Sequence, residues 1–263
     1  MPKSPKPLAD VFLNIPYDKP FQNLCLAYIS GISAFGLVPR ATLEIPSGAR
    51  RLDRILQLIQ ACQYSVHDLS RVELDAKRPP TPRFNMPFEL GLSVAWTKIS
   101  SSEHTWFVYE SRIRRLSKSL SDLDGTDAHI HSATVKGVFR ELCNAFVGED
   151  RHPTIQQMRK IYQDVTDNLP VILKQAGTHT IYTARSFKDI CIAARDSAGR
   201  NVPISAARKR VKRRASPGLM QWFSHKLSED AASKPSPFKT RRFRHPQKLM
   251  RRLSGVEGWP TRL

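Results

Sequence analysis

Glu89 is the only ionisable side chain between Asn85 and Thr97, in the stretch NMPFELGLSVAWT. A carboxylate can stabilise positive charge on a reacting atom, or attack that atom to form a covalent intermediate. Acidic residues also favour the first turn of a helix, where the dipole stabilises them by about 0.3–1 kcal/mol. Burying an unpaired carboxylate costs several kcal/mol, which exceeds that gain. We therefore expect Glu89 to face a polar cleft, to pair with a cation, or to have a raised pKa.

The same stretch predicts the element that holds Glu89. Asn85 can cap a helix that runs to about Lys98, and Pro87 is tolerated there because it falls in the first turn. The helix has no broad polar face, which is typical of a buried helix. Gly91 costs about 1 kcal/mol relative to alanine, so it indicates close approach of a ligand or another backbone. Glu89 is thus expected in the first turn of a buried helix.

Apolar runs of strand type alternate with stretches of helical spacing on both sides of this helix. The predicted strands are 9–15, 36–45, 64–70 and 104–110, and the predicted helices between them are 21–35, 50–62 and 85–98. This alternation with short connections predicts an α/β fold, a doubly wound and mostly parallel sheet flanked by helices.

The second half of the chain continues with longer connections. Residues 119–133 are interpreted as a loop, 134–147 and 154–173 as amphipathic helices, 179–184 as a late strand and 186–194 as a closing helix. We therefore expect the α/β domain to span residues 9–194, after a polar leader at residues 1–8.

Polar residues follow three of the predicted strands at the edge where doubly wound sheets bind ligands, outside the carboxyl ends of the strands. Ordinary interpretations also exist for these residues: Asn14 as a turn residue, Arg40 as a surface charge and Asp68 as a turn cap. The neighbouring His67 is interpreted as a structural histidine. The candidate ligand contacts at this edge are Asn14, Tyr17, Asp18, Arg40, Asp68 and Asn85.

Several common chemistries have no motif in this chain. It lacks a GxGxxG or GxxxxGK phosphate loop, a GxSxG nucleophile turn and an HExxH metal motif. Its four cysteines are far apart and form no CxxC pair, so we expect reduced, buried thiols and no metal site. No run of about 18 apolar residues or signal-peptide pattern occurs, which predicts a cytoplasmic protein that does not cross a membrane.

The positive charge is concentrated at the C-terminal end. Residues 194–263 hold 18 Lys and Arg against 4 Asp and Glu, a net charge of +14 out of +19 for the chain. The pattern of regular structure fails there, so residues 195–263 are expected to be a basic and largely disordered tail. Either the tail is a solvated extension or it binds nucleic-acid phosphates without sequence preference. The cations proposed for that binding are Arg208, Lys209, Arg210, Lys212, Arg213 and Arg214.

The segments VFLNIPYD, HDLS and FNMPFELGL, in that order, resemble the TIR-like and nucleoside 2-deoxyribosyltransferase-like group of flavodoxin-like domains. In that group a glutamate at the start of the helix after the third strand attacks or stabilises C1′ of a nucleoside or of the nicotinamide ribose of NAD. The resemblance places that role on Glu89. It also implies that Asp68 binds sugar hydroxyls or positions Glu89, and that Asn14 and Tyr17 contact the base or sugar.

The resemblance predicts an enzyme that cleaves an N-glycosidic bond, as an NAD glycohydrolase or a nucleoside deoxyribosyltransferase. No metal or cofactor is required for that reaction, and NAD would be a substrate. The resemblance further implies a small nucleotide or nucleoside ligand and action as a homo-oligomer. Two alternatives remain: a module that senses a nucleotide without cleaving it, and a nucleic-acid-associated protein that acts through the basic tail.

Overall fold

The computed structural model describes residues 9–44, 50–74, 78–100, 103–123 and 125–202. They contain a five-stranded sheet with the order β2-β1-β3-β4-β5, in which every neighbouring pair is parallel. The strands are β1 (Asp10–Asn14), β2 (Val38–Ala41), β3 (Tyr64–Asp68), β4 (Thr105–Glu110) and β5 (His129–Ile130). This is the flavodoxin-like strand order, so the predicted doubly wound α/β fold is confirmed.

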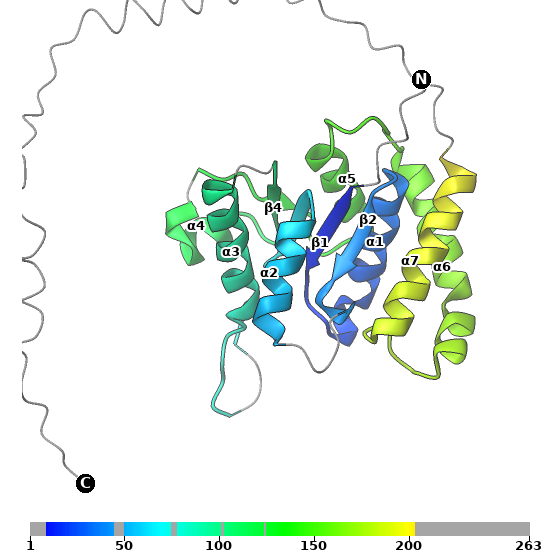
Figure 1. The fold of residues 1–263 in the computed structure, drawn as a ribbon, viewed down its shortest axis with the longest axis horizontal. Helices are drawn as coiled ribbons and strands as arrows, with labels where there is room; N and C mark the ends of the chain where they lie inside the picture. The colour runs from blue at the N-terminus through cyan, green and yellow to red at the C-terminus, as the bar shows by residue number, and fades with distance from the viewer. Residues whose placement is uncertain (1–8, 45–49, 75–77, 101–102, 124, 203–263) are drawn as a thin grey trace, which may run out of the picture. The chain divides into compact units, whose positions relative to one another are not determined.

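Helices cover both faces of the sheet (Figure 1). They are α1 (Gln22–Ala34), α2 (Arg51–Ala61), α3 (Asn85–Ile99), α4 (Arg115–Ser119), α5 (Val135–Ala145), α6 (Ile155–Ala176) and α7 (Ala184–Asn201). Helices α2, α3 and α4 lie on one side of the strands, and the other four lie on the opposite side (Figure 1). Among the described residues, none of these helices combines the length and the apolar character needed to span a bilayer.

Alternation along β1 divides the apolar core between the two faces. Val11 and Leu13 belong to the large cluster formed with α1, α5, α6 and α7, whereas Phe12 packs with Ile55 and Ile59 of α2. All three β1 residues are fully buried. Successive side chains of a strand point to opposite faces, so a central strand covered on both sides reads as a continuous apolar run.

Helix α1 is buried on nearly its whole circumference because α6 and α7 pack against it from outside. Polar residues of α1, Ser30 and Ser33, are buried together with its apolar side chains. Helix α6 begins with a capping box in which the Thr154 side chain accepts from the Gln157 N–H, and it continues through Pro170. The outer pair α6 and α7 thus adds a further layer to this side of the sheet.

Several elements differ from the sequence prediction. The expected strand 36–45 ends at Ala41, because residues 42–44 form a 3₁₀ turn in which the Glu44 carboxylate accepts the Ala41 N–H at 2.9 Å. The predicted strand at 179–184 is wrong, because Thr183 caps α7 by accepting the Ser186 N–H. The fifth strand lies instead in the segment expected to be a loop, where only His129 and Ile130 pair with β4, and helix α4 was not predicted.

Helix α7 also continues to Asn201, beyond the predicted end at 194. Side chains of α6 hold this last part: the Ser197 hydroxyl donates to the Asp164 carboxylate at 2.7 Å, and the Gln157 amide donates to the Asn201 carbonyl at 3.1 Å. Ser197 and Asn201, in the segment expected to begin the tail, therefore lie on the α6-facing side of a helix. The predicted leader, residues 1–8, and the tail from residue 203 onward lie outside the described residues.

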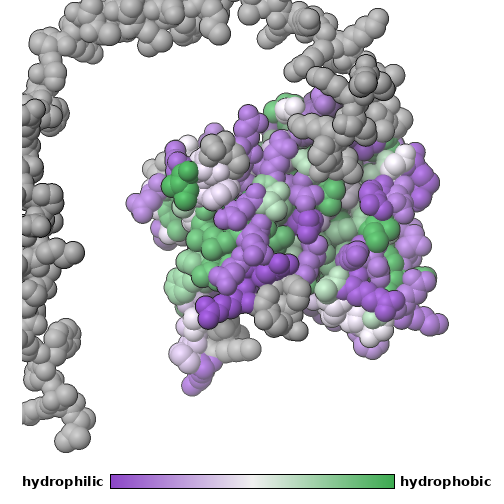
Figure 2. All heavy atoms as spheres, viewed as in Figure 1, coloured by the Kyte–Doolittle hydropathy of each residue, from purple (hydrophilic) through white to green (hydrophobic). Residues whose placement is uncertain are grey.

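Helix α3 differs from the expected buried helix in its start and in its outer face. Phe84 is the N-cap and its side chain forms no capping hydrogen bond, so Asn85 is the first helical residue and Glu89 lies just beyond the first turn. Phe88 and Ile99 are 54% and 79% exposed, and apolar side chains gather over this part of the surface (Figure 2). A methyl group added at Gly91 would meet no atom within 4 Å. The expected close approach of another backbone at Gly91 is therefore wrong for the described residues.

Two glycines give a matched pair for testing this packing. A Cβ atom at Gly137, in the first turn of α5, would lie 1.9 Å from the His131 carbonyl oxygen. We expect Gly137→Ala to lower the free energy of unfolding by about 1–3 kcal/mol, the usual cost of overpacking. Gly91→Ala should raise it by up to about 1 kcal/mol, because the site is open and alanine favours a helix. Urea denaturation of both variants would measure the difference, and equal midpoints would contradict it.

Candidate functional site

A polar cavity of about 290 Å³ opens at the carboxyl ends of β1 and β2, beside the point where the strand order reverses between β1 and β3. Its size is at the lower end of the range for small-molecule sites, roughly 300–1,000 Å³. It is lined by Asn14, Ile15, Pro16, Tyr17, Thr42, Arg51, Arg83, Asn85, Met86 and Glu89. We call it the Glu89 cavity.

The fold explains why residues from four separate segments meet there. Strand β1 ends at Asn14 and continues into the loop with Tyr17, and the 3₁₀ turn after β2 supplies Thr42. Helices α2 and α3 both begin at this edge because each follows a parallel strand, so Arg51 and Glu89 enter the same cavity. Ligands of doubly wound sheets bind at this position. Four of the seven residues predicted for the active or binding site thus line one cavity: Asn14, Tyr17, Asn85 and Glu89.

Glu89 is the buried carboxylate of the cavity. It is 3% exposed, and no described residue forms a hydrogen bond or ion pair with it. Burial raises its pKa to about 7, and the positive charge of Arg51 opposes that rise. The helix N-terminus was expected to stabilise the charged form of Glu89, but Glu89 lies outside the first turn. The group that lowers its pKa is instead Arg51 of the neighbouring helix α2.

Asn14 joins the end of β1 to the start of α3. Its side-chain amide nitrogen donates to the Met86 carbonyl oxygen at 2.9 Å and lies 2.9 Å from His67 Nδ1. Asn14 is 4% exposed although it lines the cavity. The amide therefore forms part of the cavity wall and fixes the distance between two of the elements that make it.

Tyr17 takes part in a short chain of hydrogen bonds across the cavity wall. Its hydroxyl donates to the Leu13 carbonyl at 3.3 Å and accepts from the Thr42 hydroxyl at 3.2 Å. Thr42 in turn accepts from Arg51 at 3.4 Å. Burial raises the pKa of Tyr17 well above its ordinary value, so its phenol stays neutral in the physiological range. These hydrogen bonds link Arg51 to Tyr17 through Thr42, so both side chains belong to the same wall of the cavity.

Asp18 lies next to the Glu89 cavity and acts on it through an arginine. Its carboxylate accepts the Phe21 N–H at 3.1 Å and pairs with Arg83 at 3.0 Å and with Arg71 at 3.5 Å. Arg83 lines the cavity, whereas Asp18 does not. This placement does not support a direct ligand contact for Asp18, which instead pairs with a cation of the cavity wall.

Asp68 is fully buried and does not line the Glu89 cavity. Its carboxylate accepts from the Tyr28 hydroxyl at 2.8 Å and from the Ser70 N–H at 2.9 Å, and it lies 3.1 Å from His131 Nε2. These partners occupy both oxygens. The placement does not support contact with sugar hydroxyls and matches the ordinary interpretation of Asp68 as a residue that fixes the turn after β3.

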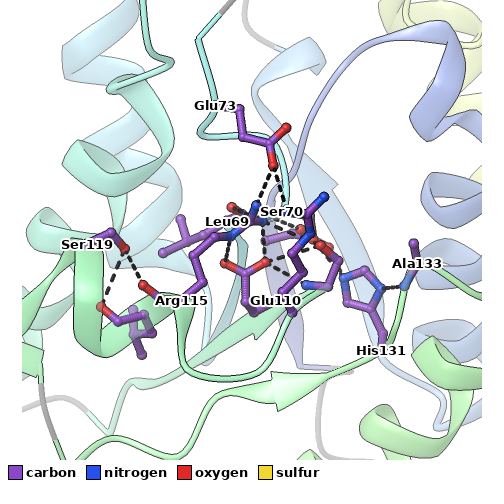
Figure 3. Close-up of polar contacts among 12 residues, drawn as sticks. Leu69, Ser70, Glu73, Glu110, Arg115, Ser119, His131 and Ala133 are labelled. Carbon is purple, nitrogen blue, oxygen red and sulfur yellow. Dashed lines mark hydrogen bonds and ion pairs between the residues drawn. The ribbon is translucent and has the colours of Figure 1, made fainter.

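Ser70, His131 and Asp68 are the residue types of a nucleophilic triad, but their hydrogen bonds run in the wrong direction. The Ala133 N–H donates to His131 Nδ1 at 3.1 Å, as seen in Figure 3, so the ring proton sits on Nε2. Nε2 is the nitrogen nearest to both the Ser70 hydroxyl, at 2.9 Å, and the Asp68 carboxylate. A protonated Nε2 cannot accept the serine proton, so this cluster is not arranged for nucleophilic catalysis.

A second ion-pair network lies at the carboxyl ends of β3 and β4. Arg115 lies between Glu110 and Glu73 and pairs with both, and it also donates to the Leu69 carbonyl at 3.3 Å (Figure 3). Glu110 is 1% exposed, so its charge is offset by the guanidinium. The carboxylates of this network are engaged with a cation, in contrast to Glu89.

Arg40 lies apart from the Glu89 cavity, on the outer strand β2. It pairs with Asp10 at 2.7 Å and with Glu44 at 3.1 Å, and it borders a different cavity of about 430 Å³ between β2 and α7. The prediction of an anion contact beside Glu89 is therefore not supported for Arg40. Two other arginines, Arg51 and Arg83, are the cations of the Glu89 cavity.

These two arginines were missed because nothing local distinguishes them from surface charges. Arg51 begins an amphipathic helix and Arg83 lies in a Pro-rich connection, and only the sheet topology brings both to one edge. The six tail cations proposed for nucleic-acid binding lie outside the described residues. Within the described part of the chain, no cluster of three or more His, Cys, Asp or Glu residues could hold a metal ion, and the four cysteines are free. Cys25 and Cys62 are buried, while Cys143 and Cys191 are partly exposed.

The raised pKa of Glu89 has a measurable effect on stability. Its folded-state value of about 7 lies above the ordinary value of 4.5, so the folded protein binds the proton more tightly between these pH values. Stability should therefore fall as pH rises from about 4.5 to 7. At about pH 8, the free energy of unfolding of Glu89→Gln should exceed that of the wild type by up to about 3 kcal/mol. At about pH 4 the two proteins should have the same stability. Urea denaturation at both pH values would measure the difference.

Asp122→Asn is the control for this experiment, because it removes one negative charge from an exposed position. It should show no comparable pH-dependent difference. A Glu89→Gln variant that is less stable than the wild type at about pH 8 would show that the carboxylate stabilises the fold.

Comparison of the chain with protein-family models, with curated proteins and with solved structures gave no match. The relation to the TIR-like and deoxyribosyltransferase-like domains therefore stays a prediction from the sequence. The chemistry of the Glu89 cavity has to be argued from the residues of this chain.

Proposed function

We propose that the Glu89 cavity binds a nucleoside or nucleotide and that Glu89 promotes cleavage of its N-glycosidic bond. The observation that carries the proposal is a buried carboxylate with no hydrogen-bonding partner in the described residues, facing a cavity at the ligand edge of the sheet. A fold gains nothing from such a group, because burial disfavours its charged form. Groups that are costly to the fold are concentrated at functional sites.

The chemistry suits an isolated carboxylate. Cleavage of an N-glycosidic bond passes through a state with positive charge on C1′ and the ring oxygen. Ionised Glu89 would stabilise that charge, or attack C1′ and form a covalent glycosyl intermediate that water then hydrolyses. A pKa of about 7 leaves a substantial ionised fraction near neutral pH. It also makes the carboxylate more basic, and therefore more nucleophilic, than an ordinary glutamate.

The other residues of the cavity fit the remaining parts of such a ligand. Arg51 and Arg83 supply positive charge for a phosphate, and Asn14, Tyr17 and Asn85 supply hydrogen-bonding groups for a sugar or base. The volume of about 290 Å³ suits one nucleoside unit. For NAD, we infer that the nicotinamide ribose half would occupy the cavity, with the rest of the molecule outside.

The order of segments in the sequence supports the same activity. The resemblance to TIR-like and deoxyribosyltransferase-like domains assigns the reacting carboxylate to Glu89, which is the carboxylate that lines the cavity. Asp68, which the resemblance assigns to the sugar, instead holds Tyr28 and His131. We therefore propose an N-glycosidic bond hydrolase or transferase whose sugar contacts come from β1 and α3.

Glu89→Gln tests the reaction directly. It removes the negative charge and keeps the size of the side chain, so base release from NAD or from deoxynucleosides should fall by at least about 100-fold. Chromatography of the products would measure it, with Asp122→Asn as the control that retains activity. Free nicotinamide would identify NAD hydrolysis, and exchange of bases between deoxynucleosides would identify a transferase.

Two outcomes would contradict the proposal. Undiminished turnover by Glu89→Gln would remove Glu89 from the reaction. Tight binding of NAD or a nucleoside by the wild type without any product would favour a sensing module that recognises the ligand and does not cleave it.

The pH dependence of the reaction provides an independent check. If ionised Glu89 is required, kcat/KM should rise with pH until about pH 7 and then level off, because the pKa of Glu89 lies there. Below that pH the rate should fall roughly tenfold per unit. A profile that is flat from about pH 5 to 8 would show that the reaction does not use this carboxylate in its charged form.

A further inference from the structure

Four buried polar side chains form a row between the sheet and the helices on the Phe12 face. They are Asn14, Ser65, His67 and His104, and each is at most 4% exposed. Asn14 of β1 and His67 of β3 are direct partners in the strand register, and the His67 ring packs edge-on against Phe12. Polar groups at such positions cost free energy unless each is hydrogen-bonded. Apolar residues would fill the same space at lower cost, so the row calls for an explanation.

The far end of the row fixes the direction of its hydrogen bonds. His104 Nδ1 lies 2.8 Å from the Cys62 carbonyl oxygen, which can only accept, so Nδ1 carries the proton. Burial lowers the pKa of His104, and the neutral ring has a single N–H. Its Nε2 therefore accepts, and the Ser65 hydroxyl at 3.0 Å donates to it.

The same reasoning continues to Asn14. Since the Ser65 proton points to His104, the Ser65 oxygen accepts from His67 Nε2–H at 2.9 Å. Burial and the neighbouring His104 lower the pKa of His67 to about 3, so this ring is neutral as well. His67 Nδ1 is therefore an acceptor, and the Asn14 amide nitrogen donates to it at 2.9 Å.

The near end of the row requires the same orientation independently. The Asn14 amide nitrogen also donates to the Met86 carbonyl oxygen at 2.9 Å, and a carbonyl cannot donate in return. Both hydrogens of the Asn14 amide are thus held by the protein. The remaining polar atom, Oδ1, is the one that Asn14 can present to the Glu89 cavity that it lines.

We propose that Asn14 determines specificity by accepting a hydrogen bond from a sugar hydroxyl of the ligand, and that His67, Ser65 and His104 are positioning residues that hold its amide in this orientation. The location argues for a sugar hydroxyl. Asn14 and Glu89 line the same cavity, and Asn14 binds the Met86 carbonyl at the start of the helix that carries Glu89. A ligand in this cavity would therefore meet both side chains. This inference rests on the proposed function of the Glu89 cavity.

The proposal predicts selection for a hydrogen-bond donor on the sugar. Nicotinamide riboside and adenosine serve as probes, each with its 2′- or 3′-hydroxyl replaced by fluorine, which is similar in size and cannot donate. For the full-length wild type, one of these replacements should weaken equilibrium binding by at least about tenfold, because an acceptor in the cavity loses its partner.

Two variants of His67 separate positioning from simple structural support. Glutamine has an acceptor and a donor on one side chain, so His67→Gln can accept from Asn14 and donate to Ser65 as the histidine does. His67→Leu does neither, so the Asn14 amide keeps only its hydrogen bond to the Met86 carbonyl and its orientation is less restricted. Discrimination between hydroxyl and fluorine should survive in His67→Gln and fall to about twofold or less in His67→Leu. Equal discrimination in the two variants would overturn the proposal, whatever their stabilities.

Histidine ¹⁵N NMR tests the orientation without any ligand. We expect the spectrum of His67 to show a protonated Nε2 and a bare Nδ1, and that of His104 to show the opposite pattern. A proton on His67 Nδ1 would turn the Asn14 amide around and overturn the proposal. If no nucleoside or NAD binds the wild type, the proposed function of the cavity fails, while the NMR result still decides the orientation of Asn14.

Discussion

The hydrogen bond from the Asn14 amide to the Met86 carbonyl sets the geometry on which the candidate site depends. It ties the end of the central strand β1 to the first turn of α3, the helix that carries Glu89. Without this link, the start of α3 would be held against the sheet mainly by apolar contacts, and these are not directional. This hydrogen bond thus fixes the position of two walls of the Glu89 cavity relative to each other.

The two faces of the sheet contribute unequally to this arrangement. On one face, α1 is enclosed by α5, α6 and α7 in a single large apolar cluster. The other face carries two small clusters, the buried polar row and the isolated carboxylate Glu89. We infer that the large cluster supplies most of the apolar burial that stabilises the fold. This stability offsets the cost of the buried polar groups on the other face.

The sequence predicted the parts of the fold that have a clear period. The alternation of strands and helices through β4 was sufficient for the doubly wound sheet, and the apolar setting of Glu89 was sufficient to select it as a candidate residue of the cavity. The sequence pattern did not predict β5, because a strand of two residues shows no period. It also missed the Thr183 cap, which begins a helix inside a run that resembles a strand.

The site was harder to predict, because its members are set by topology and hydrogen-bond direction. Asp68 and Asn14 both end strands at the ligand edge, yet one is enclosed by Tyr28, Ser70 and His131 and the other lines the cavity. Arg51 and Arg83 look like ordinary surface charges until α2 and α3 are placed side by side. Side-chain direction at the end of a strand decides such cases, and a single sequence does not contain it.

The outer strand β2 has a consequence for how copies of this domain can associate. Its Val38 N–H bonds to Ala9 at 3.0 Å, so in a parallel pair the residues whose N–H groups would point outward are Pro39 and Ala41. Proline has no N–H, and that of Ala41 is taken by the Glu44 carboxylate. At the opposite edge, β5 is two residues long and Arg140 covers the Ile130 carbonyl at 2.9 Å. Among the described residues, β2 therefore presents no free outward N–H group, which disfavours pairing of this strand with another copy.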